Sequence, residues 1–253
     1  LEFLSTAYDK TAVDFLENIG VSRHKIASFE LIDIPLIRYM ASKKKPLILS
    51  TGMASLSEIE EAVRMAIQSG SPEVTLLKCT SSYPAPINEA NLLTIPHLKT
   101  AFNLPVGISD HTPGILVPIV AVGLGIMMIE KHFTLSRSEP SPDSAFSLEP
   151  DEFRAMVDGI RIAEEALGKV TYGVTKSQEK TKVFRRSLFS TKTIEKGELF
   201  TEYNIRSIRP AHGLSPKYLD MVIGKKSSKS IKKGTPLSWD LIEGLEVEQL
   251  EEE

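Results

Sequence analysis

Short apolar segments alternate with amphipathic ones through the first half of the chain, and this alternation restricts the possible folds more than any other feature. Six segments have the length and composition of buried strands: 3–6, 25–28, 47–51, 74–79, 106–110 and 127–133. The segments between them have helical spacing, and one opens with a predicted capping box of Ser57 and Glu60. Strands that alternate with helices form parallel βαβ units, and a repeat of about 20–30 residues is usual in a (β/α)₈ barrel. The pattern therefore predicts an α/β fold of the TIM-barrel type that contains six of the eight βα units.

Each predicted strand ends in small or polar residues. They are residues 5–6, 25 and 28, 50–52, 78–80, 109–111 and 130–132. In a parallel barrel the carboxyl ends of all strands meet at one rim, where active sites are built. Contact with water explains a single polar strand end, but six in succession, rich in Ser, Thr, Lys and His, favour a binding site.

Two histidines near these strand ends are candidate metal ligands. His111 follows one predicted strand and His132 lies in the next, so both can point into one site. Neutral imidazole is a common ligand of Mn, Fe, Co and Zn, and Asp110 and Glu130 are close enough in sequence to hydrogen-bond the two rings. The alternative for each histidine is a packed or simply hydrogen-bonded side chain. The spacing leaves both interpretations open.

Three lysines end predicted strands and are expected to point toward the rim: Lys25, Lys78 and Lys131. A buried amine needs a counter-charge, and a phosphate or carboxylate ligand provides one. Hydroxyl groups that could bind the same anion belong to Ser28, Ser50, Thr51 and Ser109. Lysines that extend into solvent are the alternative. The sequence has no Walker-type loop, GxGxxG loop or Ser-His-Asp elbow. The residues alone therefore indicate a metal-assisted enzyme that acts on a small phosphorylated or carboxylated substrate.

The second half of the chain has a different organisation. After a long predicted helix at 149–167, it contains an internal repeat, in which 194–205 matches 231–242 position for position around a Lys-Gly turn. Two such copies suggest a small pseudo-symmetric domain, and the acidic C-terminal segment is expected to be disordered. The predicted parts are a barrel domain at 1–168, a linker at 169–187, a small domain at 188–245 and an acidic tail at 246–253.

Composition excludes several classes of function. The net charge of −3 leaves no strong basic field for nucleic acid or an anionic membrane. A single cysteine excludes an intrachain disulfide framework and a multi-cysteine metal site, and no apolar run reaches the roughly 18 residues that span a bilayer. We therefore expect a cytoplasmic protein without nucleic-acid or membrane partners. Because the sequence opens inside a predicted strand without an initiator methionine, we also expect a fragment of a longer protein.

Several ordered motifs carry a family resemblance. They are KIAS at 25–28, LSTGM at 49–53, CTSSYP at 79–84, GISDHT at 107–112, IEKHFT at 129–134, and PD and SLEP within 142–150. These motifs resemble the sialic acid synthase family, the phosphoenolpyruvate-dependent nonulosonate synthases. The C-terminal repeats, with IRP at 208–210, resemble that family's antifreeze-like (SAF, β-clip) domain. The resemblance implies a barrel without its first two βα units, followed by a SAF domain.

The resemblance also implies a reaction and a set of site residues. Phosphoenolpyruvate would condense with an open-chain amino sugar, assisted by a divalent Mn²⁺, Mg²⁺ or Co²⁺ ion. The implied catalytic residues are Lys25, His111 and His132, of which the two histidines would bind the metal. The implied phosphoenolpyruvate-binding residues are Thr6, Lys25, Ser28, Ser50, Ser81, Tyr83 and Ser109. The sugar would contact Asp143 and also Arg209, contributed by the partner subunit of a domain-swapped homodimer.

The string at 142–150 resembles pseudaminic acid synthases more than neuraminate or legionaminate synthases. The latter two usually carry a histidine after the aspartate, whereas Ser144 stands here. Phe146 adds an apolar surface that suits a 6-deoxy sugar. The expected sugar is therefore 2,4-diacetamido-2,4,6-trideoxy-altrose, and synthesis of N-acetylneuraminate or legionaminate is the alternative.

Two other classes of function remain open at this point. One is a non-catalytic sugar-binding remnant, because the family's first two strands carry a general acid/base Glu and a phosphate-binding Lys that are expected upstream of this sequence. The other is a barrel lyase or aldolase that uses a Schiff-base lysine. Intact His111, His132, Lys25 and Asp143 argue against the sugar-binding remnant. The strand-end lysines alone do not decide for or against the Schiff-base enzyme, which borohydride trapping with substrate would test.

Overall fold

The computed structural model describes residues 2–139 and 141–244 and divides the chain into two compact units, Leu1–Lys169 and Val170–Glu253. The acidic tail expected at 246–253 lies outside the described residues. Within the described ranges, no helix is long and apolar enough to cross a membrane.

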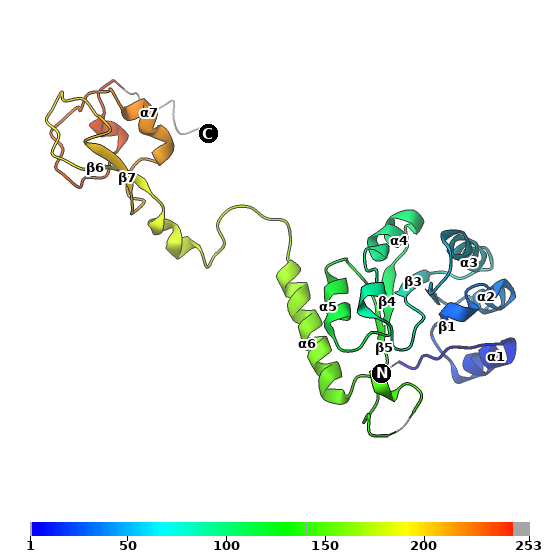
Figure 1. Ribbon diagram of the computed structural model, residues 1–253. Helices are drawn as coiled ribbons and strands as arrows, with labels where there is room; N and C mark the ends of the chain where they lie inside the picture. The colour runs from blue at the N-terminus through cyan, green and yellow to red at the C-terminus, as the bar shows by residue number, and fades with distance from the viewer. Residues whose placement is uncertain (1, 140, 245–253) are drawn as a thin grey trace. The chain divides into compact units, whose positions relative to one another are not determined.

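The first unit is built on a sheet of five parallel strands in the order β1-β2-β3-β4-β5 (Figure 1). The strands are β1 (His24–Ile26), β2 (Leu47–Ser50), β3 (Val74–Cys79), β4 (Val106–Asp110) and β5 (Ile129–Lys131). The expected α/β class is confirmed, but the strand expected at 3–6 is wrong. In that segment only Thr6 pairs, through an isolated bridge with Lys25, while Phe3 and Leu4 stay exposed and gain none of the burial that stabilises the other strands.

The α-helices of this unit are α1 (Lys10–Ile19), α2 (Ile34–Ala41), α3 (Leu56–Gln68), α4 (Thr94–Phe102), α5 (Leu116–Val122) and α6 (Pro150–Leu167). Helix α1 precedes the first strand, α2–α5 connect successive strands, and α6 follows the last strand. The capping box of α3 is formed by Ser55 and Glu58, two positions before the predicted pair of Ser57 and Glu60. The motif Ser-x-x-Glu occurs twice in this segment, and the first copy is the one that begins the helix.

The two faces of the sheet differ, because one packs against helices and the other carries polar side chains toward the carboxyl ends of the strands. Residues in register on neighbouring parallel strands point to the same face, and consecutive residues point to opposite faces. The face that packs with helices α1–α5 carries Ile26, Leu49, Leu76, Val106 and Ile108. The opposite face carries, toward the carboxyl ends of the strands, Lys25, Ser50, Cys79, Ser109 and Glu130. The fold therefore collects one polar residue from each strand on the face away from the helices.

The second unit is a small domain around an antiparallel pair, β6 (Ser187–Ser190) and β7 (Ile205–Ile208). It also contains α7 (Leu219–Val222) and a 3₁₀ helix, η4 (Glu179–Phe184), within the segment expected to be a linker. The internal repeat forms a physical pair, because the equivalent residues Ile194 and Ile231 join in an antiparallel bridge. The two Lys-Gly turns match as well, with Gly197 at φ 81° and Gly234 at φ 84°.

Candidate functional site

Lys25 is the central charged group on the polar face of the sheet. It is 4% exposed, and its Nζ donates hydrogen bonds to Ser50 Oγ at 2.7 Å and to the carbonyl oxygen of Ile26 at 3.2 Å. Its nearest carboxylate oxygen is Glu130 Oε2, at 3.6 Å. Burial lowers the pKa of Lys25, and Glu130 opposes that shift. A buried ammonium with one loosely placed counter-charge is suited to bind an anionic substrate.

Glu130 connects Lys25 to the neighbouring strands. Its Oε1 accepts a hydrogen bond of 2.6 Å from Ser109 Oγ, and its Oε2 faces Lys25. The sequence prediction that Glu130 and Asp110 hydrogen-bond the two histidines is therefore wrong, because Glu130 serves Lys25 and Ser109 while Asp110 lies on the opposite face. Alternation along β5 is the signal that could have placed Glu130 correctly.

A second group of hydroxyls lies beside this row. Ser81 Oγ donates to Ser28 Oγ at 2.7 Å, and a Cβ built on Gly52 would lie 2.4 Å from Ser28 Cβ and 2.7 Å from Ser81 Oγ. Only a glycine therefore lets the chain after β2 approach this pair so closely. Thr6 pairs in register with Lys25 and so belongs to the same face.

The two histidines meet at the carboxyl ends of β4 and β5, with ring centroids 5.2 Å apart. His111 Nδ1 lies 2.9 Å from the carbonyl oxygen of Thr80, a contact that makes Nδ1 the donor and leaves Nε2 as the basic nitrogen. Burial lowers the pKa of His111, the Thr80 hydrogen bond raises it, and His132 lowers it again. His132 Nδ1 lies 3.5 Å from Asp143 Oδ2. The predicted sugar ligand thus stands beside the predicted metal ligand.

Two aromatic rings pack against this histidine pair. The ring of Tyr83 lies 4.3 Å from His111 and 6.0 Å from His132, measured between centroids. Phe146 lies 5.0 Å from His132 and is 5% exposed. Burial raises the pKa of Tyr83, so its hydroxyl remains a neutral hydrogen-bonding group at physiological pH.

Two of the three lysines expected at the rim do not point into the site. Lys78 is in register with Ile108, and Lys131 with Asp110, so both lie on the helix side of the sheet. Lys78 Nζ donates to Thr80 Oγ1 at 2.6 Å. Lys131 has Asp110 as its counter-charge, with Nζ 2.6 Å from Oδ2. The expectation that all three lysines share one anion is wrong. Consecutive residues of a strand point to opposite faces, so a difference of one position places a lysine on the helix side of the sheet.

The family of the chain follows from comparison with known proteins. A model of the NeuB family matches residues 1–172. The chain belongs to the NeuB family. A SAF domain model matches residues 185–243. These matches confirm the expected sialic acid synthase family and its C-terminal SAF domain.

Several relatives of this NeuB-family chain are named synthases. Pseudaminic acid synthase from Campylobacter jejuni is 46% identical over 233 residues, which cover 92% of this chain and 68% of that protein. N,N'-diacetyllegionaminic acid synthase from the same species is 43% identical over 235 residues, which cover 92% and 70%. The solved structure of the spore coat polysaccharide biosynthesis protein SpsE from Bacillus subtilis aligns with a TM-score of 0.63 at 36% identity, covering 96% of this chain and 73% of that one. The expected enzyme class, a synthase of this family, is confirmed.

The residues of this NeuB-family site fit a divalent metal that would be coordinated partly by the protein and partly by substrate and water. In the part of the chain that the structure describes, no group of three or more His, Cys, Asp or Glu side chains is arranged to hold an ion. His111 and His132 supply two imidazoles, and the Thr80 carbonyl holds the first of them with Nε2 as its basic nitrogen. Two protein ligands leave further positions open for a reacting oxygen.

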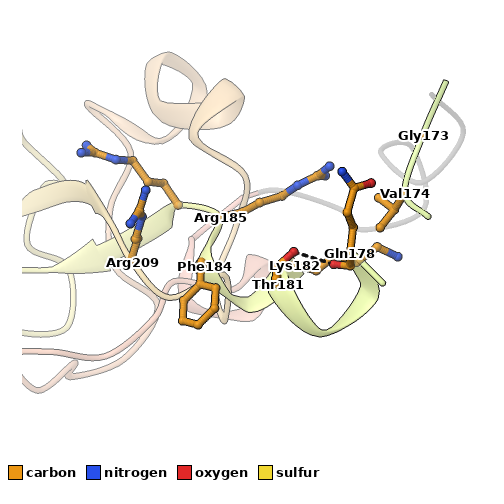
Figure 2. Close-up of a pocket in the computed structure, with 9 residues that line it drawn as sticks. Gly173, Val174, Gln178, Thr181, Lys182, Phe184, Arg185 and Arg209 are labelled. Carbon is orange, nitrogen blue, oxygen red and sulfur yellow. Dashed lines mark hydrogen bonds between the residues drawn. The ribbon is translucent and has the colours of Figure 1, made fainter. Parts of the chain in front are cut away.

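Arg209, the last predicted site residue, belongs to the second unit. There it lines a pocket of about 550 Å³ together with the cationic side chains of Lys182, Arg185 and Arg186 (Figure 2). The carbonyl oxygen of Val183 accepts a hydrogen bond of 2.9 Å from the backbone N–H of Ala211, which ties the Arg209 loop to η4. The contact of Arg209 with a sugar stays a prediction.

Proposed function

We propose that this chain catalyses the condensation of phosphoenolpyruvate with 2,4-diacetamido-2,4,6-trideoxy-altrose to give pseudaminic acid and phosphate. The observation that carries the proposal is the placement of a buried ammonium beside a histidine pair at one end of one sheet face. The ammonium of Lys25 suits a phosphate or carboxylate group, and the imidazoles of His111 and His132 suit a metal that polarises a carbonyl oxygen. The proposed reaction needs both.

In the proposed reaction, C3 of phosphoenolpyruvate attacks the aldehyde carbon of the open-chain sugar and forms the new C–C bond. The aldehyde oxygen takes up a proton and becomes a hydroxyl. Water supplies the oxygen at C2, and the C2–O bond to phosphate breaks, so that phosphate leaves with the bridging oxygen. One water is consumed for each product, and the remaining carbonyl at C2 is that of the nonulosonic acid.

The chain's own residues would orient phosphoenolpyruvate. Lys25 would supply the positive charge, and hydroxyl groups would come from Ser50, which accepts a hydrogen bond from Lys25, and from Ser109, which donates one to Glu130. The hydrogen-bonded pair of Ser28 and Ser81 offers two further hydroxyls across from Gly52. A doubly charged substrate that enters this row replaces the 3.6 Å contact of Lys25 with Glu130 by closer contacts.

The other end of the site would hold the sugar aldehyde. His111 and His132 would hold the divalent ion, which when bound would act as a Lewis acid on the aldehyde oxygen. Asp143, 3.5 Å from His132 Nδ1, would orient that ring and accept hydrogen bonds from sugar hydroxyls. Tyr83 packs against His111 and Phe146 against His132, so the two rings have aromatic neighbours.

The proposed preference for the 6-deoxy altrose sugar rests on the relatives of the chain and on Phe146. The relatives named pseudaminic acid synthase and N,N'-diacetyllegionaminic acid synthase are 46% and 43% identical to this chain, a small difference. Phe146 is buried against His132 and Tyr83, so it makes this wall of the site apolar, which favours a 6-deoxy sugar over N-acetylmannosamine with its hydroxymethyl group at C6.

The experiment is phosphate release from phosphoenolpyruvate with Mn²⁺ and, in turn, the diacetamido altrose sugar, the legionaminate precursor and N-acetylmannosamine. We expect the altrose sugar to be fastest, with a ratio to N-acetylmannosamine of about a hundredfold, since a hydrophobic pocket rejects one hydroxyl by no more than that. Chelation should abolish release and Mn²⁺ should restore it. Equal turnover of N-acetylmannosamine would overturn the proposed substrate, and absence of metal and phosphoenolpyruvate binding would favour the sugar-binding alternative.

We also propose that Arg209 acts on the sugar in the site of a partner subunit within a domain-swapped homodimer. Its guanidinium suits several directed hydrogen bonds. A mixture of the Arg209→Ala and His132→Ala variants tests this, because an exchanged dimer contains one site with both residues intact. Recovery of activity after subunit exchange supports the proposal. Exchange without recovery means that Arg209 acts in its own chain or has no role.

A further inference from the structure

A buried ion pair lies directly behind the two histidines. Lys131 Nζ is 2.6 Å from Asp110 Oδ2, and the two side chains are 1% and 2% exposed. The two residues are in register across β4 and β5, and each is followed immediately by a histidine, His111 or His132. The ion pair therefore links the two strands one residue before each imidazole, on the opposite face of the sheet.

The same pair also holds the chain after His111. Asp110 Oδ1 accepts a hydrogen bond of 3.0 Å from the backbone N–H of Thr112, and Lys131 Nζ donates to the carbonyl oxygen of Thr112. Both backbone polar groups of Thr112 are thus bound by the ion pair. His111 lies between Asp110 and Thr112, so its backbone is fixed on both sides relative to β5.

The attraction between the two charges gives by itself no reason for placing them here. Both charged groups of a buried ion pair lose their hydrating water, which costs free energy. Apolar residues of similar size therefore often stabilise a fold equally well. Apolar residues could not bind the N–H and carbonyl of Thr112. What the charged pair adds is therefore a directional connection between the two histidine-bearing segments.

We propose that Asp110 and Lys131 are positioning residues that set the separation and orientation of His111 and His132, and through them the affinity of the site for a divalent metal. The metal part of this inference rests on the proposed function, whereas the geometric part does not. Outer groups that orient metal ligands commonly change metal affinity by about 10–100-fold. We expect a loss of this size when the pair is broken without unfolding.

The test measures Mn²⁺ affinity and ring geometry separately in the full chain. The variants are Lys131→Met, Asp110→Asn and the double change Asp110→Asn with Lys131→Gln, which keeps neutral polar groups in case a lone buried charge unfolds the chain. Mn²⁺ binding is followed by electron paramagnetic resonance. The contact between the two imidazoles, whose centroids lie 5.2 Å apart, is followed in the metal-free protein by nuclear Overhauser effects.

Lys45→Met is the matched control, because Lys45 pairs with Glu17 at 2.9 Å in the same unit and lies before β2, at the amino ends of the strands. We expect the double variant to lose the ring-to-ring contact and to bind Mn²⁺ at least tenfold more weakly, with phosphoenolpyruvate affinity unchanged, while Lys45→Met changes none of the three. A merely structural role would lower Mn²⁺ and phosphoenolpyruvate affinity together.

Retention of the ring contact in the double variant would overturn the inference. If the parent chain shows the ring contact but binds no Mn²⁺, the metal function fails, and the nuclear Overhauser measurement still decides whether the ion pair positions the histidines. Failure of the inference and failure of the proposed function are therefore separate results.

Discussion

Gly52 offers a sharp test of the proposed anion site, because alanine there adds one methyl group where no space exists. The added Cβ would lie 2.4 Å from Ser28 Cβ and 2.7 Å from Ser81 Oγ, whereas carbon atoms in ordinary contact are about 3.5–4.0 Å apart. Ser28 must therefore move by about 1 Å or more. That movement separates it from Ser81, with which it shares a 2.7 Å hydrogen bond.

Two effects of the Gly52→Ala change can be estimated. The backbone of Gly52 has φ 49°, in the left-handed region, where a Cβ costs about 1–2 kcal/mol. For a chain of this size such a cost lowers the melting temperature by roughly 2–8 °C. The displaced hydroxyls add a second effect, because a misplacement of about 1 Å in a positioned site costs up to about a hundredfold. We expect the Kd for phosphoenolpyruvate to rise by about 10–100-fold.

Gly20→Ala is the matched control for this prediction. Gly20 also has a positive φ, 85°, but a Cβ built on it meets nothing within 4 Å, so the change carries the backbone cost without the collision. Both variants should melt at lower temperature by differential scanning calorimetry, and only Gly52→Ala should lose phosphoenolpyruvate affinity by isothermal titration. Equal affinities in the two variants would show that Ser28 and Ser81 do not hold the anion.

Three further predictions concern the charge of the site and the stability of the two units. Burial lowers the pKa of Lys25 below the ordinary 10.5, so its ammonium is lost at a lower pH than that of an exposed lysine. As the pH rises, the affinity for phosphoenolpyruvate measured by titration calorimetry should therefore fall before pH 10.5 is reached. The Lys25→Arg change should move this loss of affinity to higher pH. Ser55→Ala removes the observed cap of α3 and should cost about 1 kcal/mol in chemical denaturation, whereas a larger cost for Ser57→Ala would contradict the observed box. Phe200→Ala empties a fully buried position of the second unit and should cost that unit about 3–5 kcal/mol in denaturation monitored by circular dichroism. It should leave the Kd for phosphoenolpyruvate unchanged, since the proposed anion site lies in the first unit.

The fold was largely predictable because each strand carries its own local signal. The strands at 74–79 and 106–110 are buried along their whole length, and each begins with or contains Val, Leu or Ile, which are typical of buried strands. The segment 3–6 has a similar composition, yet only Thr6 pairs with a neighbour. Strand formation depends on hydrogen bonds to another strand, and the local sequence does not contain that information.

The types of residue in the candidate site were predictable from the sequence. The face of the sheet to which each side chain points was less predictable. His111 and His132 lie together, and Lys25 contacts Glu130, two residues before His132. Lys78 and Lys131 were expected to join them, but they occupy the other face of the sheet. Polar residues in the sequence indicate where a strand ends. The face of the sheet on which a polar side chain lies depends on the register between neighbouring strands.

Contacts between residues distant in sequence were beyond prediction from the residues alone. Ser28 and Ser81 are 53 positions apart and hydrogen-bond each other. Glu130 joins Lys25 to Ser109, although its sequence neighbour His132 suggested a role beside the metal. These contacts depend on how far the sheet curls, a property of all five strands together.

The dipeptides Asp110-His111 and Lys131-His132 show how one short motif serves both faces of the sheet. Consecutive residues point in opposite directions, so a charge that precedes a histidine must lie behind it. Two such dipeptides on adjacent strands in register bring opposite charges together on one face and two imidazoles together on the other. A shift of one residue in the pairing of β4 and β5 would exchange the faces and bury the histidines among the helices. The ion pair therefore favours the single register in which the histidines face the polar side, and the motif specifies the site and its support at the same time.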